Sequence, residues 1–102
     1  MIVEIECLPR PYGEPGAPYS FVEAAIRVIQ ESGLKYEVSA LGTTFEGEPE
    51  EAWRVARAAH EACLAAGAES VLTIVKFSQS RMPNPPTMES LTAKFRQDGG
   101  AA

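Results

Sequence analysis

The sequence predicts one α+β domain in which two strand–helix–strand units share an antiparallel sheet and place both helices on one face. Three observations predict this fold. Residues 2–8 and 71–77 are rich in β-branched side chains, as strands are, and two segments between them have the apolar spacing of amphipathic helices. Glycine and proline separate these segments. A chain of 102 residues with 45% hydrophobic side chains also suits a single core.

The first predicted strand covers residues 2–8. Val3, Ile5 and Cys7 alternate there with two glutamates, which gives the strand one buried and one polar face. Residues 9–18 follow with four prolines and two glycines, so we expect a stiff loop without regular structure.

The first predicted helix runs from about residue 20 to 32. Ser20 and Glu23 have the spacing of a capping box, in which each side chain hydrogen-bonds the free backbone N–H near the other residue. Gly33 can adopt the left-handed conformation that ends a helix. Five apolar residues recur at helical spacing between them: Phe21, Val22, Ala25, Ile26 and Ile29.

The second unit begins with a strand over residues 35–40 and resumes after Gly42, which predicts a hairpin or a bulged strand pair around this glycine. Pro49 is placed for the first turn of a second helix, which Gly67 ends. The stripe expected to be buried on that helix consists of Trp53, Ala56, Ala59, His60, Cys63 and Leu64.

The last strand, residues 71–77, is apolar on both faces, so we expect it at the centre of the sheet. Because both helices lie on one face, apolar side chains remain on the other, and a second copy of the chain is the expected cover. A short helix should follow within residues 87–96. The domain is expected to span 1–97, and residues 98–102 to form a flexible tail.

The charge of the chain limits its partners. A formal net charge of -5 and a pI near 4.8 disfavour nucleic acid and anionic membrane surfaces as partners. No apolar run is long enough to span a bilayer and no signal peptide is evident, so a cytoplasmic location is expected. Cys7 and Cys63 lie in regular elements without metal-ligand spacing, which favours buried free thiols. We expect no metal site and no cofactor.

Catalysis has one candidate pair in the sequence. His60 and Cys63 are three residues apart on one helix and could form a nucleophilic pair, but packing alone also explains both residues. No phosphate-binding loop, dinucleotide fingerprint or zinc-protease motif is present. We therefore expect a protein that is not an enzyme.

Several polar and aromatic residues could contact a ligand. Glu46 comes at the end of a strand, the Gly42-Thr43 segment offers a hydroxyl and a close backbone approach, and Ser20 begins a helix. Turn formation explains the Gly42-Thr43 segment equally well, and helix capping explains Ser20. Aromatic stacking candidates are Tyr19, Tyr36 and Trp53, although core packing explains such residues too. Carboxylates that could bind a cation or an aminopyrimidine, or simply be solvated, are Glu4 and Glu6.

Three segments, residues 31–38, 41–48 and 59–62, resemble the MTH1187/YkoF-like family of thiamine-binding proteins. The resemblance extends from Ile2 to about Lys76. It implies a ferredoxin-like fold, assembly through the sheets into a dimer or tetramer, and binding of thiamine or its hydroxymethylpyrimidine part. The family's motif residues carry over onto Gly42, Thr43, Glu46 and Ser20, and Tyr19 is our candidate stacking surface. The expected function is thus non-catalytic small-molecule binding, and the alternative is an oligomeric structural or regulatory interaction module without this ligand.

Overall fold

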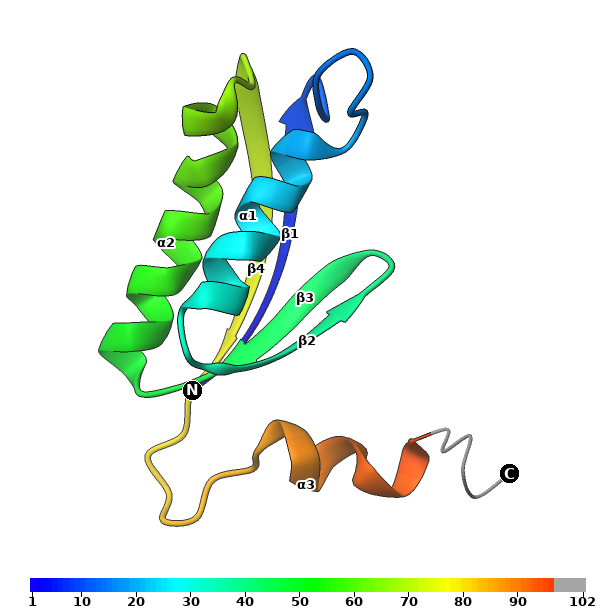
Figure 1. Cartoon of the computed structure of the whole chain (residues 1–102). Helices are drawn as coiled ribbons and strands as arrows, with labels where there is room; N and C mark the ends of the chain where they lie inside the picture. The colour runs from blue at the N-terminus through cyan, green and yellow to red at the C-terminus, as the bar shows by residue number, and fades with distance from the viewer. Residues whose placement is uncertain (97–102) are drawn as a thin grey trace.

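Four antiparallel strands in the order β2-β3-β1-β4 carry two long helices on one face (Figure 1). The computed structural model describes residues 1–96. Within them the elements are β1 (Ile2–Arg10), α1 (Ser20–Glu31), β2 (Lys35–Ser39), β3 (Gly42–Glu46), α2 (Pro49–Ala66), β4 (Ser70–Ser78), α3 (Met88–Thr92) and a 3-10 turn, Ala93–Phe95. This arrangement confirms the predicted α+β, ferredoxin-like fold. The tail predicted at 98–102 lies outside the described residues.

Strand β4 forms an edge of the sheet, and β1 lies inside it between β3 and β4. Strand β1 pairs with β4 through nine residues, from Ile2↔Ser78 to Arg10↔Ser70, and with β3 through four. The prediction that the last strand is central was wrong. This strand is apolar on both faces, but helices cover only one of them. Leu72 and Ile74 are 64% and 49% exposed on the side of the sheet that no helix covers.

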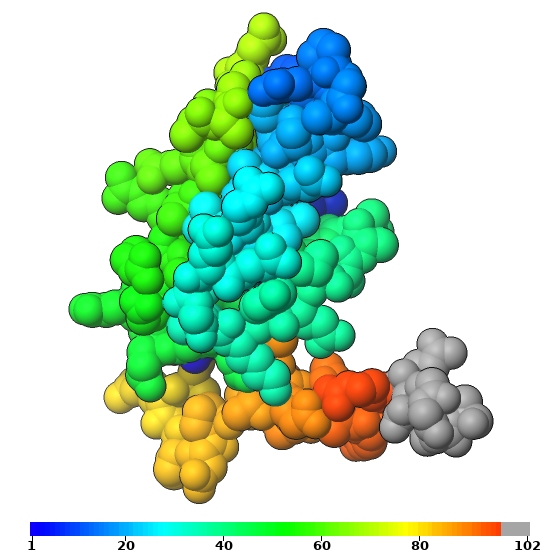
Figure 2. All heavy atoms as spheres, viewed as in Figure 1, coloured from blue at the N-terminus to red at the C-terminus, as the bar shows by residue number. Residues whose placement is uncertain are grey.

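The core lies between the sheet and the two helices, whose side chains cover most of the face seen in Figure 2. The buried stripe of α2 differs from the predicted one, since Trp53 is 53% and Leu64 44% exposed. Small side chains on α2 let this helix pack closely against α1 and the sheet. The stripe that is actually buried consists of Ala52, Val55, Ala56, Ala59 and Cys63.

The proline-rich segment after β1 is anchored to the start of α1. Tyr12 O accepts hydrogen bonds from the N–H of Phe21 at 3.0 Å and of Val22 at 3.3 Å. The predicted capping box is absent, because Tyr19 holds the cap position and Ser20 is already helical. Ser20 Oγ instead accepts a hydrogen bond from the N–H of Glu14 at 3.1 Å, so the serine fastens the loop to the helix.

The C-terminal segment lies across the end of the domain at which the N-terminus is found (Figure 1). Thr87 and Ser90 form a capping box at the start of α3, and Met88 is buried. Lys35 Nζ approaches a Glu89 carboxylate oxygen at 3.7 Å. Among residues 1–96, no helix has both the length and the apolar character needed to cross a membrane.

Candidate ligand-binding site

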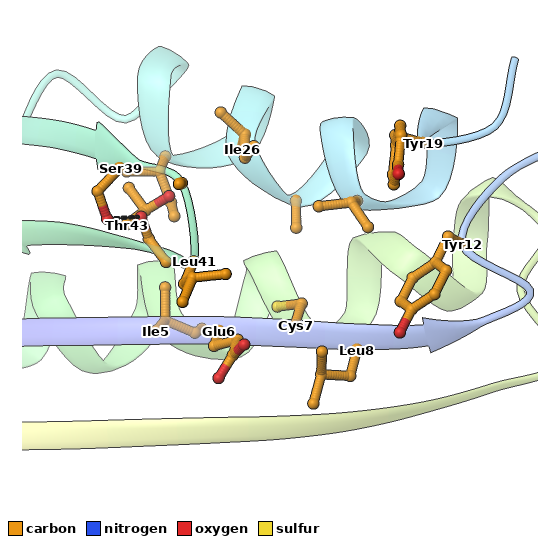
Figure 3. A pocket seen from close by; sticks show the side chains of 15 residues that line it. Ile5, Glu6, Cys7, Leu8, Tyr12, Tyr19, Ile26, Ser39, Leu41 and Thr43 are labelled. Carbon is orange, nitrogen blue, oxygen red and sulfur yellow. Dashed lines mark hydrogen bonds between the residues drawn. The ribbon is translucent and has the colours of Figure 1, made fainter.

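A pocket of about 400 Å³ lies between α1, β1 and the tip of the β2–β3 hairpin (Figure 3). It exists because β3 is shorter than β1. The β1–β3 ladder ends at the pair Ile5↔Thr43, whereas the β1–β4 ladder continues to Arg10. The second half of β1 therefore has a neighbouring strand on one side only, and the pocket occupies the other side.

The walls of this pocket are largely apolar and aromatic. Helix α1 contributes Val22 and Ile26 among its lining residues, and Tyr12 and Tyr19 close the end opposite the hairpin (Figure 3). The two tyrosine rings are 6.3 Å apart between centroids and inclined at 41°. The Arg10 guanidinium lies 4.7 Å from the centroid of the Tyr12 ring. A flat apolar ligand could thus contact two aromatic rings.

Polar groups gather at the hairpin end of the pocket. Thr43 is only 4% exposed, and it lines the pocket at this end. Ser39 Oγ donates to Gly42 O at 2.9 Å. A Cβ at Gly42 would lie 3.2 Å from Ile5 O, so a glycine suits the close approach of the hairpin to β1. The Glu6 side chain also borders the pocket but points away from α1 (Figure 3).

The thiol at the pocket is poorly suited to attack a ligand. Burial raises the pKa of Cys7, which lines the pocket, and burial raises the pKa of Cys63 beneath it to about 12. Both thiols are free, as predicted, but only Cys63 is buried, whereas Cys7 is partly exposed at the pocket. His60 Nδ1 lies 2.6 Å from Thr73 Oγ1, so the imidazole that was a candidate partner for Cys63 is engaged with strand β4 instead.

Trp53 lies in another hollow, of about 280 Å³, between α2 and β4. Its ring stacks on Phe77, with centroids 3.9 Å apart and planes inclined at 28°. One of its two faces is therefore already covered. This predicted stacking residue lies apart from the pocket that contains Tyr19.

The pocket brings together three of the five predicted site residues: Tyr19, Gly42 and Thr43. Ser20 and Glu46 are outside it. Glu46 and Thr43 face opposite sides of β3, because this strand pairs without a bulge and residues three apart then point opposite ways. Glu46 Oε2 accepts a hydrogen bond from the Met88 N–H at 3.2 Å.

Sequence reasoning missed Tyr12 and the edge of β1 as parts of the pocket. Tyr12 could have been suspected, since it is an aromatic residue held in a proline-rich loop directly after a strand. No pattern in the sequence indicates the exposed edge of β1, because this edge depends on where the pairing of β1 with β3 stops.

The chain is similar to several known proteins. A family described as thiamine-binding protein matches residues 3–96. The UPF0045 protein CPE1503 of Clostridium perfringens is 30% identical over 86 residues, which cover 84% of this chain and 88% of that protein. A UPF0045 protein of Methanothermobacter thermautotrophicus is 38% identical over 63 residues, or 61% of this chain and 64% of that one.

Solved structures share the fold. A domain of unknown function from Bacillus cereus has a TM-score of 0.75 at 35% identity, with 94% of this chain and 91% of that chain covered. A candidate thiamine biosynthesis/salvage protein from Thermotoga maritima has a TM-score of 0.77 at 26% identity, with coverage of 93% and 97%.

Proposed function

This chain belongs to the thiamine-binding protein family, and from that premise we propose that it binds thiamine, or the hydroxymethylpyrimidine part of thiamine, without catalysing a reaction. The observation that carries the proposal is the pocket of about 400 Å³ between α1, β1 and the hairpin. Its volume lies within the range typical of small-molecule sites, roughly 300–1,000 Å³.

The chemistry of the pocket supports a ligand with a flat ring and a positive charge. Tyr12 and Tyr19 offer ring faces and edges, and Thr43 offers a hydroxyl. Glu6 stands at the border of the pocket, and among residues 1–96 it has no ion-pair partner, whereas Glu4 is 3.4 Å from Lys76 Nζ. We place the aminopyrimidine in the pocket and the cationic thiazolium toward Glu6.

The five predicted site residues take two kinds of role in this proposal. Tyr19, Gly42 and Thr43 contact the ligand. Ser20 acts indirectly, because it fastens the loop that carries Tyr12. Glu46 lies on the opposite sheet face and helps to hold α3, since its carboxylate accepts a hydrogen bond from the Met88 N–H.

Binding without catalysis is supported by the raised pKa of the Cys7 thiol, because the neutral thiol is a weak nucleophile. Thiamine incubated with the protein should therefore be recovered unchanged, as mass spectrometry can establish. Conversion of one or more molecules of thiamine per protein chain would contradict this part of the proposal.

We propose, in addition, that two copies associate through the open sheet face. Leu72 and Ile74 are exposed beside each other there, across from Leu8 and Glu6 of β1. Apolar side chains clustered on a sheet face are commonly covered by a second subunit. This surface also supports the alternative function, an interaction module, which would form the same assembly without binding thiamine.

Calorimetric titration of thiamine into Tyr19 variants tests the proposed site. Tyr19→Ala should weaken binding by roughly fivefold or more, because an aromatic contact of about 1 kcal/mol is lost, while Tyr19→Phe keeps the ring and should retain most of the affinity. Tyr36→Ala is the matched control, since Tyr36 is 40% exposed on β2 outside the pocket. Equal affinity in all four proteins would remove Tyr19 from the site.

A further inference from the structure

The floor of the pocket is the edge of strand β1. Four consecutive residues line the pocket, from Ile5 to Leu8. Side chains alternate between the two faces of a sheet, so four residues in a row cannot all line one pocket with their side chains. The Glu6 and Leu8 side chains do point away from α1 (Figure 3). The backbone of β1 must therefore form part of the floor.

Hydrogen bonds at the start of the strand show which backbone groups face that side. The N-terminal nitrogen of Met1 donates to Gly47 O at 2.9 Å, and the N–H of Gly47 donates to Met1 O at 3.1 Å. Such a two-way exchange defines a hydrogen-bonded pair of an antiparallel ladder, and these pairs recur at every second residue. Odd-numbered residues of β1 thus direct their N–H and C=O groups toward β3, and even-numbered residues direct theirs toward β4.

This alternation continues to the end of the strand, because the register with β4 runs without a bulge to Arg10↔Ser70. Cys7 and Pro9 are therefore the odd-numbered residues beyond the last β1–β3 pair, Ile5↔Thr43. Pro9 fits this position, since a proline without an N–H is tolerated where no strand pairs with it. Cys7 retains both groups, one donor and one acceptor, on the side where the pocket lies.

We propose that the N–H and C=O of Cys7 form the recognition edge of the pocket for a planar heterocycle with an acceptor and a donor side by side. A 4-aminopyrimidine has this pattern: a ring nitrogen accepts from the Cys7 N–H, and the neighbouring amino group donates to the Cys7 C=O. The heterocycle takes the place of the residue that would pair with Cys7 if the β1–β3 ladder were longer. This inference rests on the proposed function. It adds that the site recognises the adjacent hydrogen-bond acceptor and donor of the ligand.

The recognition edge should discriminate between analogues of one shape. In the 4-oxo analogue of thiamine, an oxygen replaces the amino group and the adjacent ring nitrogen carries a proton. Both positions are then reversed, so donor meets donor and acceptor meets acceptor. A site that reads a hydrogen-bond pattern strongly rejects a ligand that leaves its polar groups unpaired.

Titration calorimetry with thiamine and its 4-oxo analogue on the wild-type chain tests the proposal. We expect the oxo analogue to bind at least tenfold more weakly, the factor that corresponds to about 1.4 kcal/mol. Thiamine binding with equal affinity for the oxo analogue would overturn the recognition edge and leave the proposed function standing. Failure of thiamine itself to bind would overturn both.

A second test removes the backbone N–H of Cys7 and compares the result with a matched control. Cys7→Pro removes the N–H that faces the pocket while sparing the ladder with β4, whereas Cys7→Ala removes the thiol and keeps the N–H. We expect thiamine to bind Cys7→Pro at least tenfold more weakly than Cys7→Ala. Equal affinity in two folded variants would contradict the proposal. If circular dichroism shows that Cys7→Pro is unfolded, the analogue pair on the wild-type chain decides.

Discussion

Thr43 and Glu46 lie on opposite faces of strand β3, with Thr43 buried beneath α1 and Glu46 hydrogen-bonded to the N–H of Met88 at 3.2 Å. They are three positions apart on an unbulged strand, and an odd number of steps reverses the face. One strand thus serves two surfaces. Its helix-facing side contributes to the pocket, and its open side holds the start of the C-terminal helix.

The position of Glu46 predicts that its removal loosens α3 and spares ligand binding. In Glu46→Ala the Met88 N–H loses its carboxylate acceptor, so its amide hydrogen should exchange several-fold faster, as expected for a bond worth about 1 kcal/mol. Glu46→Gln retains an acceptor oxygen and is the control. Thiamine affinity should stay within about twofold in both variants. A tenfold loss of affinity in Glu46→Gln would place this carboxylate in the ligand site instead.

The Thr43 hydroxyl is predicted to bind the ligand and to contribute little to folding. Thr43→Val has almost the same shape and removes only the hydroxyl, so thiamine affinity should fall by roughly fivefold while the free energy of unfolding changes little. Thr44→Val is the matched control, because Thr44 faces the other side of the same strand. Calorimetry and urea unfolding on both variants provide the readouts. Identical affinities for the two variants would exclude the Thr43 hydroxyl as a contact.

The fold was predictable from the sequence because its signals are local. Alternation marks β1, Pro49 and Gly67 bound α2, and the order of elements fixes the topology. The place of β4 was not predictable from its composition, since a strand that is apolar on both faces suits a central position as well as an uncovered one. The capping box failed because Tyr19, and not Ser20, holds the cap position, and the Ser20 hydroxyl accepts a hydrogen bond from the preceding loop.

The candidate site was predictable only in part. Gly42 and Thr43 followed from the hairpin and the family resemblance, and Tyr19 from its type. The pocket itself depends on a difference in strand length, which leaves the edge of β1 unpaired after Ile5. Such a difference is a tertiary property, and residue spacing does not encode it directly.

The buried Cys63 thiol should make the protein less stable in alkaline solution. Burial holds the pKa of Cys63 at about 12 in the folded chain, whereas a thiol in the unfolded chain has a pKa near 8.5. The folded state therefore keeps its proton over a range in which the unfolded state loses it, so stability is full below pH ~8.5 and falls as the pH rises toward 12.

Comparison with Cys63→Ala isolates this contribution. Between pH 7.5 and 9.5 the unfolding free energy of the wild-type chain should drop by about 1 kcal/mol more than that of the variant, as urea unfolding can measure. The remaining titrations are common to both proteins and cancel in the difference. Parallel pH profiles would show that the Cys63 thiol ionises equally in the folded and unfolded chains.

Light scattering tests the proposed assembly through the open sheet face. The mass in solution should be at least twice the 11.0 kDa of one chain. Ile74→Asp places a charge among the exposed apolar side chains of that face and should shift the protein toward the monomer. Leu64→Asp is the control, because Leu64 is 44% exposed on α2. A monomeric wild-type chain at micromolar concentration would contradict the assembly.

Isothermal titration of thiamine into the wild-type protein shows directly whether the pocket binds this ligand. A pocket of about 400 Å³ with tyrosine rings, a threonine in its lining and a carboxylate at its border predicts saturable binding of one thiamine per chain. Binding only to the native state should also raise the melting temperature as thiamine is added. Saturable heat together with this shift is the predicted result. The absence of both at millimolar thiamine would contradict the account.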